Sequence, residues 1–351
     1  MQNAFTLSEK HLLQWANQLA GLYKFFAPVL KKRGQTVFEN VKRADQLNLY
    51  YCFTMTSPRR FVYPPRQELF EINRLKDDYK EALPENDEKQ IIFAIHPCDM
   101  HAISVLDRTF LGDFADRYYE KLRSNTATIV LNCNRACDKG FCSSMGTGPF
   151  VQLKNGFDIV MTRMEKNFLL EPVSEKGQKL LSQAENLQPA TQNDFTEKKS
   201  IESYSIASFT KKLDVKGLPE LMANNPEHPV YQRTADERCL GCTNCTMVCP
   251  TCYCYNIEDY TTYDLKTSVR GRYWDSCQEL NFAKVHHGNF RSSRKARLRQ
   301  FVMHKLCTWI EQYGCFGCIG CGRCMTWCPT GIDLTEMARE IQQDAKAGKI
   351  K

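Results

Sequence analysis

The sequence lacks the marks of several large classes of protein. It has no apolar run near the roughly 20 residues that a membrane-spanning helix needs, and its mean hydropathy is −0.47. Its first residues, MQNAFTLSEKHLLQW, lack the basic patch, apolar core and cleavage site of a signal peptide. We therefore expect a cytoplasmic protein without a membrane span.

Nucleotide-binding fingerprints are also missing. The sequence contains neither a G-x-G-x-x-G motif nor a P-loop, and GTGP at 146–149 is too short to count as either. The chain therefore has no evident site for a hydride carrier. If it moves single electrons, we expect it to be a subunit that connects a catalytic partner to an electron donor.

Cysteine is abundant: the chain has 18 cysteines in 351 residues. In a small secreted protein this would indicate disulfides. This chain is long and carries no export signal, and its cysteines cluster at the spacing of metal ligands. The pattern therefore favours metal binding over disulfides.

Two copies of one motif, C-x2-C-x2-C-x3-C-P, lie in the last third of the chain, ending at Pro250 and Pro329. In this motif three thiolates hold one [4Fe–4S] cluster and the fourth cysteine ligates the other cluster. The first cluster is then assigned Cys239, Cys242, Cys245 and Cys328. The second is assigned Cys318, Cys321, Cys324 and Cys249. Structural zinc is the weaker alternative, because zinc knuckles use two C-x2-C pairs without the proline.

The 67 residues between Pro250 and Cys318 are more than a compact two-cluster ferredoxin needs. They include NFRSSRKARLRQFVMHKLCTWIEQYG, which predicts a long helix and a helical variety of ferredoxin domain. Nine Lys or Arg and two acidic residues lie between Arg270 and Lys305. These basic residues would stabilise reduced clusters or attract an acidic partner, or form a solvated helix face. We do not expect nucleic-acid binding.

The first part of the chain predicts an α/β domain. IIFAI and ATIVLNC indicate buried strands, and HAISVLDRTFL between them indicates a helix, an order typical of a parallel sheet. Residues 1–50 are predicted to be helical, and FDIVMTRMEKNFLLEPV to form a hairpin. We expect an α/β domain over residues 1–235 and a mainly helical 2×[4Fe–4S] ferredoxin-type domain over 236–351.

Ten cysteines lie outside the eight assigned ligands. Four of them follow predicted strands in the first domain and could hold a third [4Fe–4S] cluster or another metal at one sheet edge: Cys98, Cys133, Cys137 and Cys142. Three others could complete that third site instead: Cys252, Cys254 and Cys277. Spacing alone does not rank the two groups. Cys52 and Cys315 are treated as non-ligands, and Cys307 as a core residue.

Several strings together resemble a known family: HPCDMHAISVLD, CSSMGTGP, CPTCYCY, RYWDSCQ and CIGCGRC. The chain resembles the beta subunit of cytosolic NAD(P)-linked [NiFe] hydrogenases of the sulfhydrogenase type. It is also similar to the iron–sulfur electron-transfer subunit of anaerobic sulfite reductase, and the SMGT string does not separate the two. The hydrogenase group is favoured by WDSCQ and by the PPR-like string in PRRFVYPPRQELFE, at residues 58–71.

The resemblance implies an electron-transfer subunit without a catalytic centre of its own. Its partners would be a flavin subunit that binds NAD(P)H and the small and large hydrogenase subunits, or the catalytic subunit of a sulfite reductase. The family's N-terminal cysteines match Cys98, Cys133 and Cys142, but Gly140 stands where the family has a cysteine. Cys137 could replace that thiol. A stand-alone flavin-linked oxidoreductase is the alternative from another class.

Overall fold

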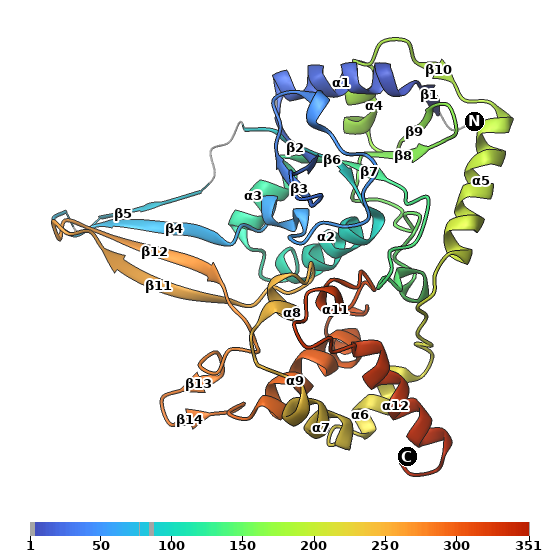
Figure 1. Cartoon of the computed structure of the whole chain (residues 1–351). Coiled ribbons are helices and arrows are strands. Elements are labelled where there is room, and N and C mark those ends of the chain that lie inside the picture. The colour runs from blue at the N-terminus through green and yellow to red at the C-terminus, as the bar shows by residue number, and fades with distance from the viewer. Residues whose placement is uncertain (1–3, 77, 84–87, 351) are drawn as a thin grey trace.

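The computed structural model describes residues 4–76, 78–83 and 88–350. Its upper part is a mixed sheet of eight strands in the order β10-β1-β9-β8-β7-β6-β2-β3 (Figure 1). The four central strands run parallel: β2 (Lys24–Leu30), β6 (Gln90–Ile95), β7 (Thr126–Leu131) and β8 (Ile159–Arg163). The parallel sheet expected from the strand–helix–strand order is therefore present.

Antiparallel strands flank this parallel centre on both sides. They are β3 (Thr36–Asn40), β9 (Phe168–Pro172), β1 (Phe5–Leu7) and β10 (Gln188–Pro189). Strands β8 and β9 pair antiparallel, which confirms the expected hairpin. The edges of the sheet are thus formed by short strands.

Helices cover both faces of the sheet. On one face, α1 (Glu9–Leu22) and α4 (Glu175–Leu181) share a core with Phe93 of β6. On the other, α2 (Pro97–Phe110) and α3 (Arg117–Ser124) pack over Ile92 and Val130. Helix α5 (Gln192–Ala207) then runs along one side of the molecule and leads to the C-terminal half, which is the lower half in Figure 1.

The expectation that residues 1–50 are helical is wrong beyond Leu22. Helix α1 is present, but the chain is extended at Tyr23 and then forms strands β2 and β3. The run KFFAPVL is buried nearly throughout because β2 lies inside the sheet, between β6 and β3. Such continuous burial is typical of a central strand. Residues 1–3 lie outside the described residues.

The lower half of the molecule is built from short helices (Figure 1). They are α6 (Leu218–Asn224), α7 (Pro229–Glu237), α8 (Asn244–Met247), α9 (Arg294–Met303), α10 (Trp309–Tyr313), α11 (Arg323–Thr326) and α12 (Leu334–Lys346). A π-helical turn over His304–Thr308 joins α9 to α10. The spacer helix that the sequence predicts is therefore present from Arg294 to Tyr313.

A four-stranded antiparallel arm projects from the junction of the two halves (Figure 1). It consists of β11 (Tyr255–Thr261), β12 (Thr267–Trp274), β4 (Arg66–Asn73) and β5 (Asp78–Glu81), in that order. A small hairpin, β13 (Lys284–Val285) and β14 (Gly288–Asn289), follows. The sequence predicted a mainly helical C-terminal half, and this is not clearly the case. Its strands β11 and β12 form one sheet with β4 and β5 of the N-terminal half, through the pairing of β12 with β4.

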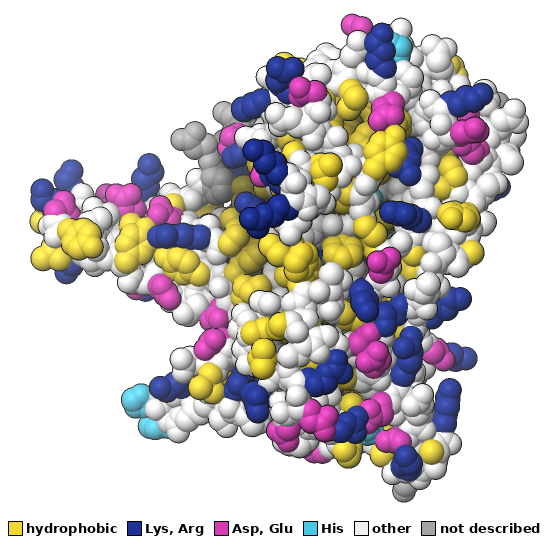
Figure 2. All heavy atoms as spheres, in the orientation of Figure 1, with side chains coloured by type: hydrophobic (Ala, Val, Ile, Leu, Met, Phe, Trp, Pro, Cys, Tyr) yellow, Lys and Arg dark blue, Asp and Glu magenta, His cyan; other side chains and the backbone are white. Residues whose placement is uncertain are grey.

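The arm carries exposed apolar side chains, among them Leu75, Tyr79, Tyr263 and Leu265. Figure 2 shows yellow side chains along the arm and onward over the centre of the same face. In the part of the chain that the structure describes, no helix is long and apolar enough to cross a membrane.

Candidate metal centres

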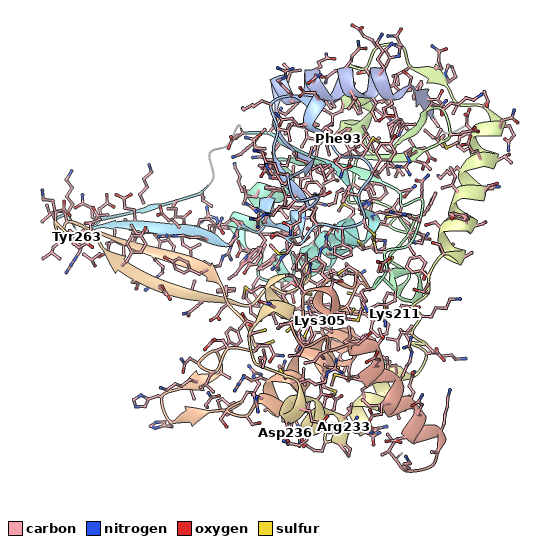
Figure 3. All side chains as sticks on the ribbon, in the orientation of Figure 1. Phe93, Lys211, Arg233, Asp236, Tyr263 and Lys305 are labelled. Carbon is pink, nitrogen blue, oxygen red and sulfur yellow. A yellow bond between two sulfur atoms is a disulfide. The ribbon has the colours of Figure 1, made fainter. Side chains whose placement is uncertain are left out.

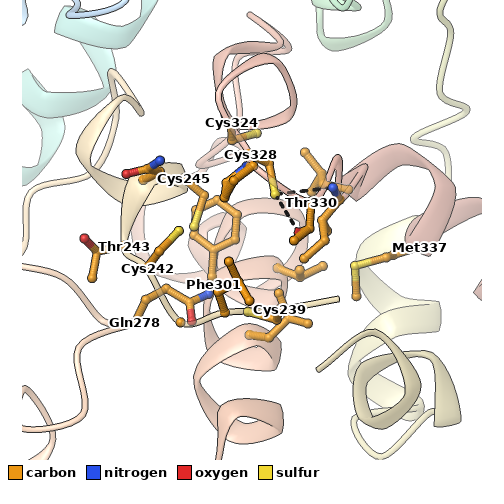
Figure 4. Close-up of a pocket in the computed structure, with 18 residues that line it drawn as sticks. Cys239, Cys242, Thr243, Cys245, Gln278, Phe301, Cys324, Cys328, Thr330 and Met337 are labelled. Atoms are coloured by element: carbon orange, nitrogen blue, oxygen red, sulfur yellow. Dashed lines mark hydrogen bonds between the residues drawn. The ribbon is translucent and has the colours of Figure 1, made fainter. Parts of the chain in front are cut away.

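The four thiols assigned to the first cluster surround one pocket in the lower half (Figure 4). Cys239 follows α7 and Cys245 lies in α8, while Cys328 comes from the other motif, just after α11. Cys242 is exposed, so this pocket lies near the surface. The Cys328 thiol accepts a hydrogen bond from Ile332 N (3.3 Å) and shares another with Thr330 Oγ1 (3.4 Å).

The lining of this pocket fits a cluster held by thiolates. Gln278 is 2% exposed, and both its amide nitrogen and its amide oxygen are buried without a hydrogen-bond partner. Figure 4 shows its side chain among the pocket-lining residues, on the side of Cys239 and Cys242. A buried amide left unpaired costs about 1–3 kcal/mol. An acceptor inside the pocket, such as the sulfur of a cluster, would satisfy its N–H groups.

The two cysteine motifs adopt the same backbone turns. Gly241 (φ 65°) and Gly320 (φ 64°) occupy equivalent positions, and so do Thr243 (φ 67°) and Gly322 (φ 78°). Successive turns of this kind direct backbone N–H groups inward and form concavities that bind anions. A non-glycine residue with positive φ is uncommon, so Thr243 indicates that this turn is required.

The second set of thiols lies where the lower half meets the upper half. Cys249 follows α8, Cys318 and Cys321 precede α11, and Cys324 lies in it. All four are close enough to influence one another electrostatically, and burial raises the pKa of Cys318 to about 12. Because metal-bound cysteines are thiolates, a bound cluster would have to overcome this cost of burying them.

Lys305, on the π-helical turn, lies among these thiols near the centre of the molecule (Figure 3). Its side chain is buried, and its ammonium donates to Thr251 Oγ1 (2.8 Å). Within the described residues it forms no ion pair with a carboxylate. Burial opposes its charge, yet the thiols of Cys249, Cys252 and Cys318 raise its pKa above the ordinary value. An anionic cluster would supply the missing counter-charge.

The N-terminal cysteines gather at the carboxyl edge of the sheet. Cys98 opens α2 directly after β6, and Cys133 follows β7. With Cys142 they line one hollow, which Cys321 of the second set also lines. The structure therefore places these three thiols together at the carboxyl ends of the strands, where the sequence predicted them.

Cys137 differs from expectation, because its sulfur is joined to Cys52 in a disulfide. It was expected to offer a free thiol to the third site, and Cys52 was expected to take no part. Both residues line the hollow. The fourth thiol of this site is therefore available only when the disulfide is reduced. The other 16 cysteines are free.

The remaining predicted ligands lie elsewhere. Cys254 directly precedes β11 and Cys277 follows β12, so the hairpin brings them together. Cys252 contacts Cys249. None of the three lines the hollow of the N-terminal thiols, so the two groups are not alternatives for one place. Among the described side chains, no group of three or more His, Cys, Asp or Glu is arranged to hold a single metal ion.

Hydrogen bonds to backbone carbonyls of the second motif hold it against the N-terminal thiols. Phe141 N donates to Gly320 O (2.7 Å), and Thr147 Oγ1 donates to Ile319 O (2.7 Å). A Cβ atom at Gly320 would lie 2.7 Å from both the N and Cα atoms of Cys142. The absence of a side chain at Gly320 therefore allows the two cysteine loops to touch.

A buried ion pair lies at the same junction. Arg323 and Asp99 have side chains that are 0% exposed, and Nη2 of the arginine is 2.7 Å from Oδ2 of the aspartate. Arg323 Nε also donates to Thr54 O (2.7 Å), and Ser57 Oγ donates to Asp99 Oδ1 (2.7 Å). The pair thus joins α11, which carries Cys324, to α2, which carries Cys98.

Replacing Gly320 with alanine should destabilise the chain much more than replacing Gly241. Both residues have positive φ, so alanine costs about 1–2 kcal/mol at either position. At Gly241 the nearest atom to a new Cβ is 3.6 Å away, on the Arg297 side chain, whereas at Gly320 it meets backbone. Overpacking should add about 1–3 kcal/mol there. Urea denaturation of the anaerobic protein measures both, and equal losses would contradict the close contact.

Four residues of these centres were not predicted from the sequence. Cys52 stands alone in the sequence, and only the fold brings it to Cys137. Lys305 lies in a basic stretch, and Arg323 lies between Cys321 and Cys324 of the second motif. Neither setting indicates that the side chain is buried. Gln278 had a signal, because it directly follows Cys277 in the WDSCQ string.

Comparisons with known proteins agree with this geometry. A family model described as a 4Fe-4S dicluster domain matches residues 238–332, the part that contains both motifs. The chain is 31% identical over 341 residues to sulfhydrogenase 2 subunit beta of Pyrococcus furiosus, an alignment covering 96% of this chain and 98% of that protein. No solved structure is significantly similar. The chain belongs to the family of sulfhydrogenase beta subunits.

Proposed function

We propose that the chain is the electron-transfer subunit of a multi-subunit [NiFe] hydrogenase. It relays electrons between the hydrogenase module and a subunit that binds flavin and NAD(P)H. The observation that carries the proposal is the interlocked pair of cysteine sets, in a chain similar over nearly its whole length to a sulfhydrogenase beta subunit. The cofactors proposed are two [4Fe–4S] clusters, bound by the eight motif cysteines, and a third in the N-terminal half.

The third centre is proposed at Cys98, Cys133 and Cys142. Its fourth thiol is Cys137 or Cys52, once an external dithiol has reduced the disulfide to two thiols with two electrons and two protons and has itself become a disulfide. The supporting observation is the hollow that these five cysteines share.

The arrangement of the thiols supports a path with two ends. When bound, [4Fe–4S] clusters accept and release single electrons. The first set has its exposed member, Cys242, near the surface. The second set lies between the first set and the N-terminal hollow, since Cys324 lines the pocket of the first and Cys321 lines that hollow. One partner would then dock near Cys242 and the other near the N-terminal thiols.

Two experiments test the proposal. The chain purified alone should neither oxidise H2 nor reduce sulfite, and it should contain no flavin. Isolated under anaerobic conditions from its native source with its partners, it should co-purify with a nickel-containing subunit. Sirohaem in the partner would instead make the chain the electron-transfer subunit of a sulfite reductase. Robust activity or bound flavin in the isolated chain would contradict the subunit role.

A further inference from the structure

Hydrogen bonds tie Lys305 to two cysteines of the second set. Its backbone carbonyl accepts from Cys318 N (3.0 Å). Its ammonium donates to Thr251 Oγ1 (2.8 Å), and the same hydroxyl oxygen lies 3.3 Å from the sulfur of Cys249. A single buried hydroxyl group therefore separates this cation from a sulfur that is assigned to the second cluster.

The surroundings of Lys305 hold it in this place. The residue lies in the π-helical turn His304–Thr308, and such turns are frequent at functional sites. The ammonium lies 4.6 Å from the centre of the Trp309 ring. That ring is buried and would overlap a side chain at Gly317, whose carbonyl accepts from the Thr251 hydroxyl. The ring and the hydroxyl together fix the ammonium beside the second set.

The charge of this ammonium has no partner of opposite sign in the protein alone. Lys305 is 2% exposed, and among the described residues it forms no ion pair with a carboxylate. Burying an unpaired cation costs several kcal/mol. Burial alone would lower the pKa of Lys305, but the thiols of Cys249, Cys252 and Cys318 raise it above its ordinary value. The side chain therefore stays charged and faces the second set.

The first set has no cation in the same position. Among the described residues that line its pocket, none is a lysine or an arginine. Arg297 is buried nearby, but its guanidinium donates to the carbonyls of Arg291 (3.3 Å) and Ser292 (2.6 Å). Since Coulomb energy falls with distance, the charge of Lys305 should act on the second cluster more strongly than on the first.

We propose that Lys305, acting through Thr251, raises the reduction potential of the second cluster. The potential of a cluster depends on net charge and on hydrogen bonds to its sulfurs. Reduction adds one negative charge, which a fixed cation stabilises. A metal-bound Cys249 carries no proton, so the Thr251 hydroxyl, polarised by the ammonium, is the donor in their 3.3 Å contact. The inference rests on the proposed function, in which the second set lies between the first set and the N-terminal hollow.

The test is a redox titration of the full-length, anaerobically reconstituted chain, followed by electron paramagnetic resonance. The signal that is lost in Cys321→Ser identifies the second cluster. Lys305→Met should make the midpoint potential of this cluster more negative and leave that of the first cluster nearly unchanged. Thr251→Val should shift the potential in the same direction. Thr251→Ser should keep the original potential, because it retains the hydroxyl.

Lys295→Met is the matched control. Lys295 lies on α9, before the π-helical turn, and its ammonium pairs with Glu227 (2.6 Å), so this variant should shift neither potential. An unchanged midpoint in Lys305→Met, or equal shifts of both clusters, would overturn the inference. If Lys305→Met does not retain the second cluster, Thr251→Val decides, and a midpoint equal to that of Thr251→Ser would overturn it. An unsubstituted chain without the second signal would contradict the proposed function as well, so the two failures are distinguishable.

Discussion

Replacing Cys328 with serine should remove the cluster held by the other motif. Cys328 lies in the second motif, but it lines the pocket of Cys239, Cys242 and Cys245. With one of four thiolates lost, that cluster should bind weakly, and iron should fall by up to about four per chain. The electron paramagnetic resonance spectrum of the reduced Cys328→Ser chain should then match that of Cys242→Ser.

Cys315 provides the control for this experiment. It is free, half-buried and three residues before Cys318, yet it belongs to no proposed ligand set. Cys315→Ser should leave iron and spectrum unchanged. The reciprocal variant, Cys249→Ser, should match Cys321→Ser. A Cys328→Ser spectrum that matches Cys321→Ser would mean that each motif holds its own cluster.

Arg323→Met should be the most destabilising charge substitution at the junction of the halves. It leaves Asp99 buried with its hydroxyl partner Ser57 but without its cation. Removing one partner of a buried ion pair costs about 3–5 kcal/mol. Urea denaturation of the anaerobic, reconstituted chain measures the loss.

Two further variants separate the charge effect from lost packing. The double variant Arg323→Met/Asp99→Leu should recover part of the loss, because no unpaired charge stays buried. Arg117→Met breaks an ion pair at the surface, in which the Arg117 side chain is 65% exposed and that of Glu81 is 33% exposed. This variant should cost at most about 1 kcal/mol of unfolding free energy. If Arg323→Met costs no more than Arg117→Met, the pair does not hold the halves together.

The sequence predicts the core of the fold where local pattern and tertiary setting agree. IIFAI and ATIVLNC are continuous apolar runs, and both form buried parallel strands. KFFAPVL is also an apolar run that forms a buried strand, but the sequence pattern assigned it to the helix before it, which ends at Leu22. The arm was missed because β12 pairs with β4, from the other half of the chain. Single-segment patterns do not record such distant pairing.

The grouping of the thiols is likewise predictable from the sequence where it is local and not where it depends on distant contacts. Motif spacing groups Cys239, Cys242 and Cys245 locally, and the structure agrees. The pairing of Cys52 with Cys137 depends on how a loop after β3 folds back on the sheet edge, which spacing does not encode. Burial of Lys305 is equally hidden, because a lysine in a basic run is ordinarily expected at the surface.

The most direct test of the central claim is the iron and acid-labile sulfide content of the anaerobically purified chain, with the electron paramagnetic resonance spectrum of its reduced form. Two interlocked [4Fe–4S] clusters predict at least about eight irons and eight sulfides per chain. The spectrum should show the signals of reduced [4Fe–4S] clusters. Clearly fewer than eight irons after reconstitution, or stoichiometric zinc in a colourless protein, would contradict the account.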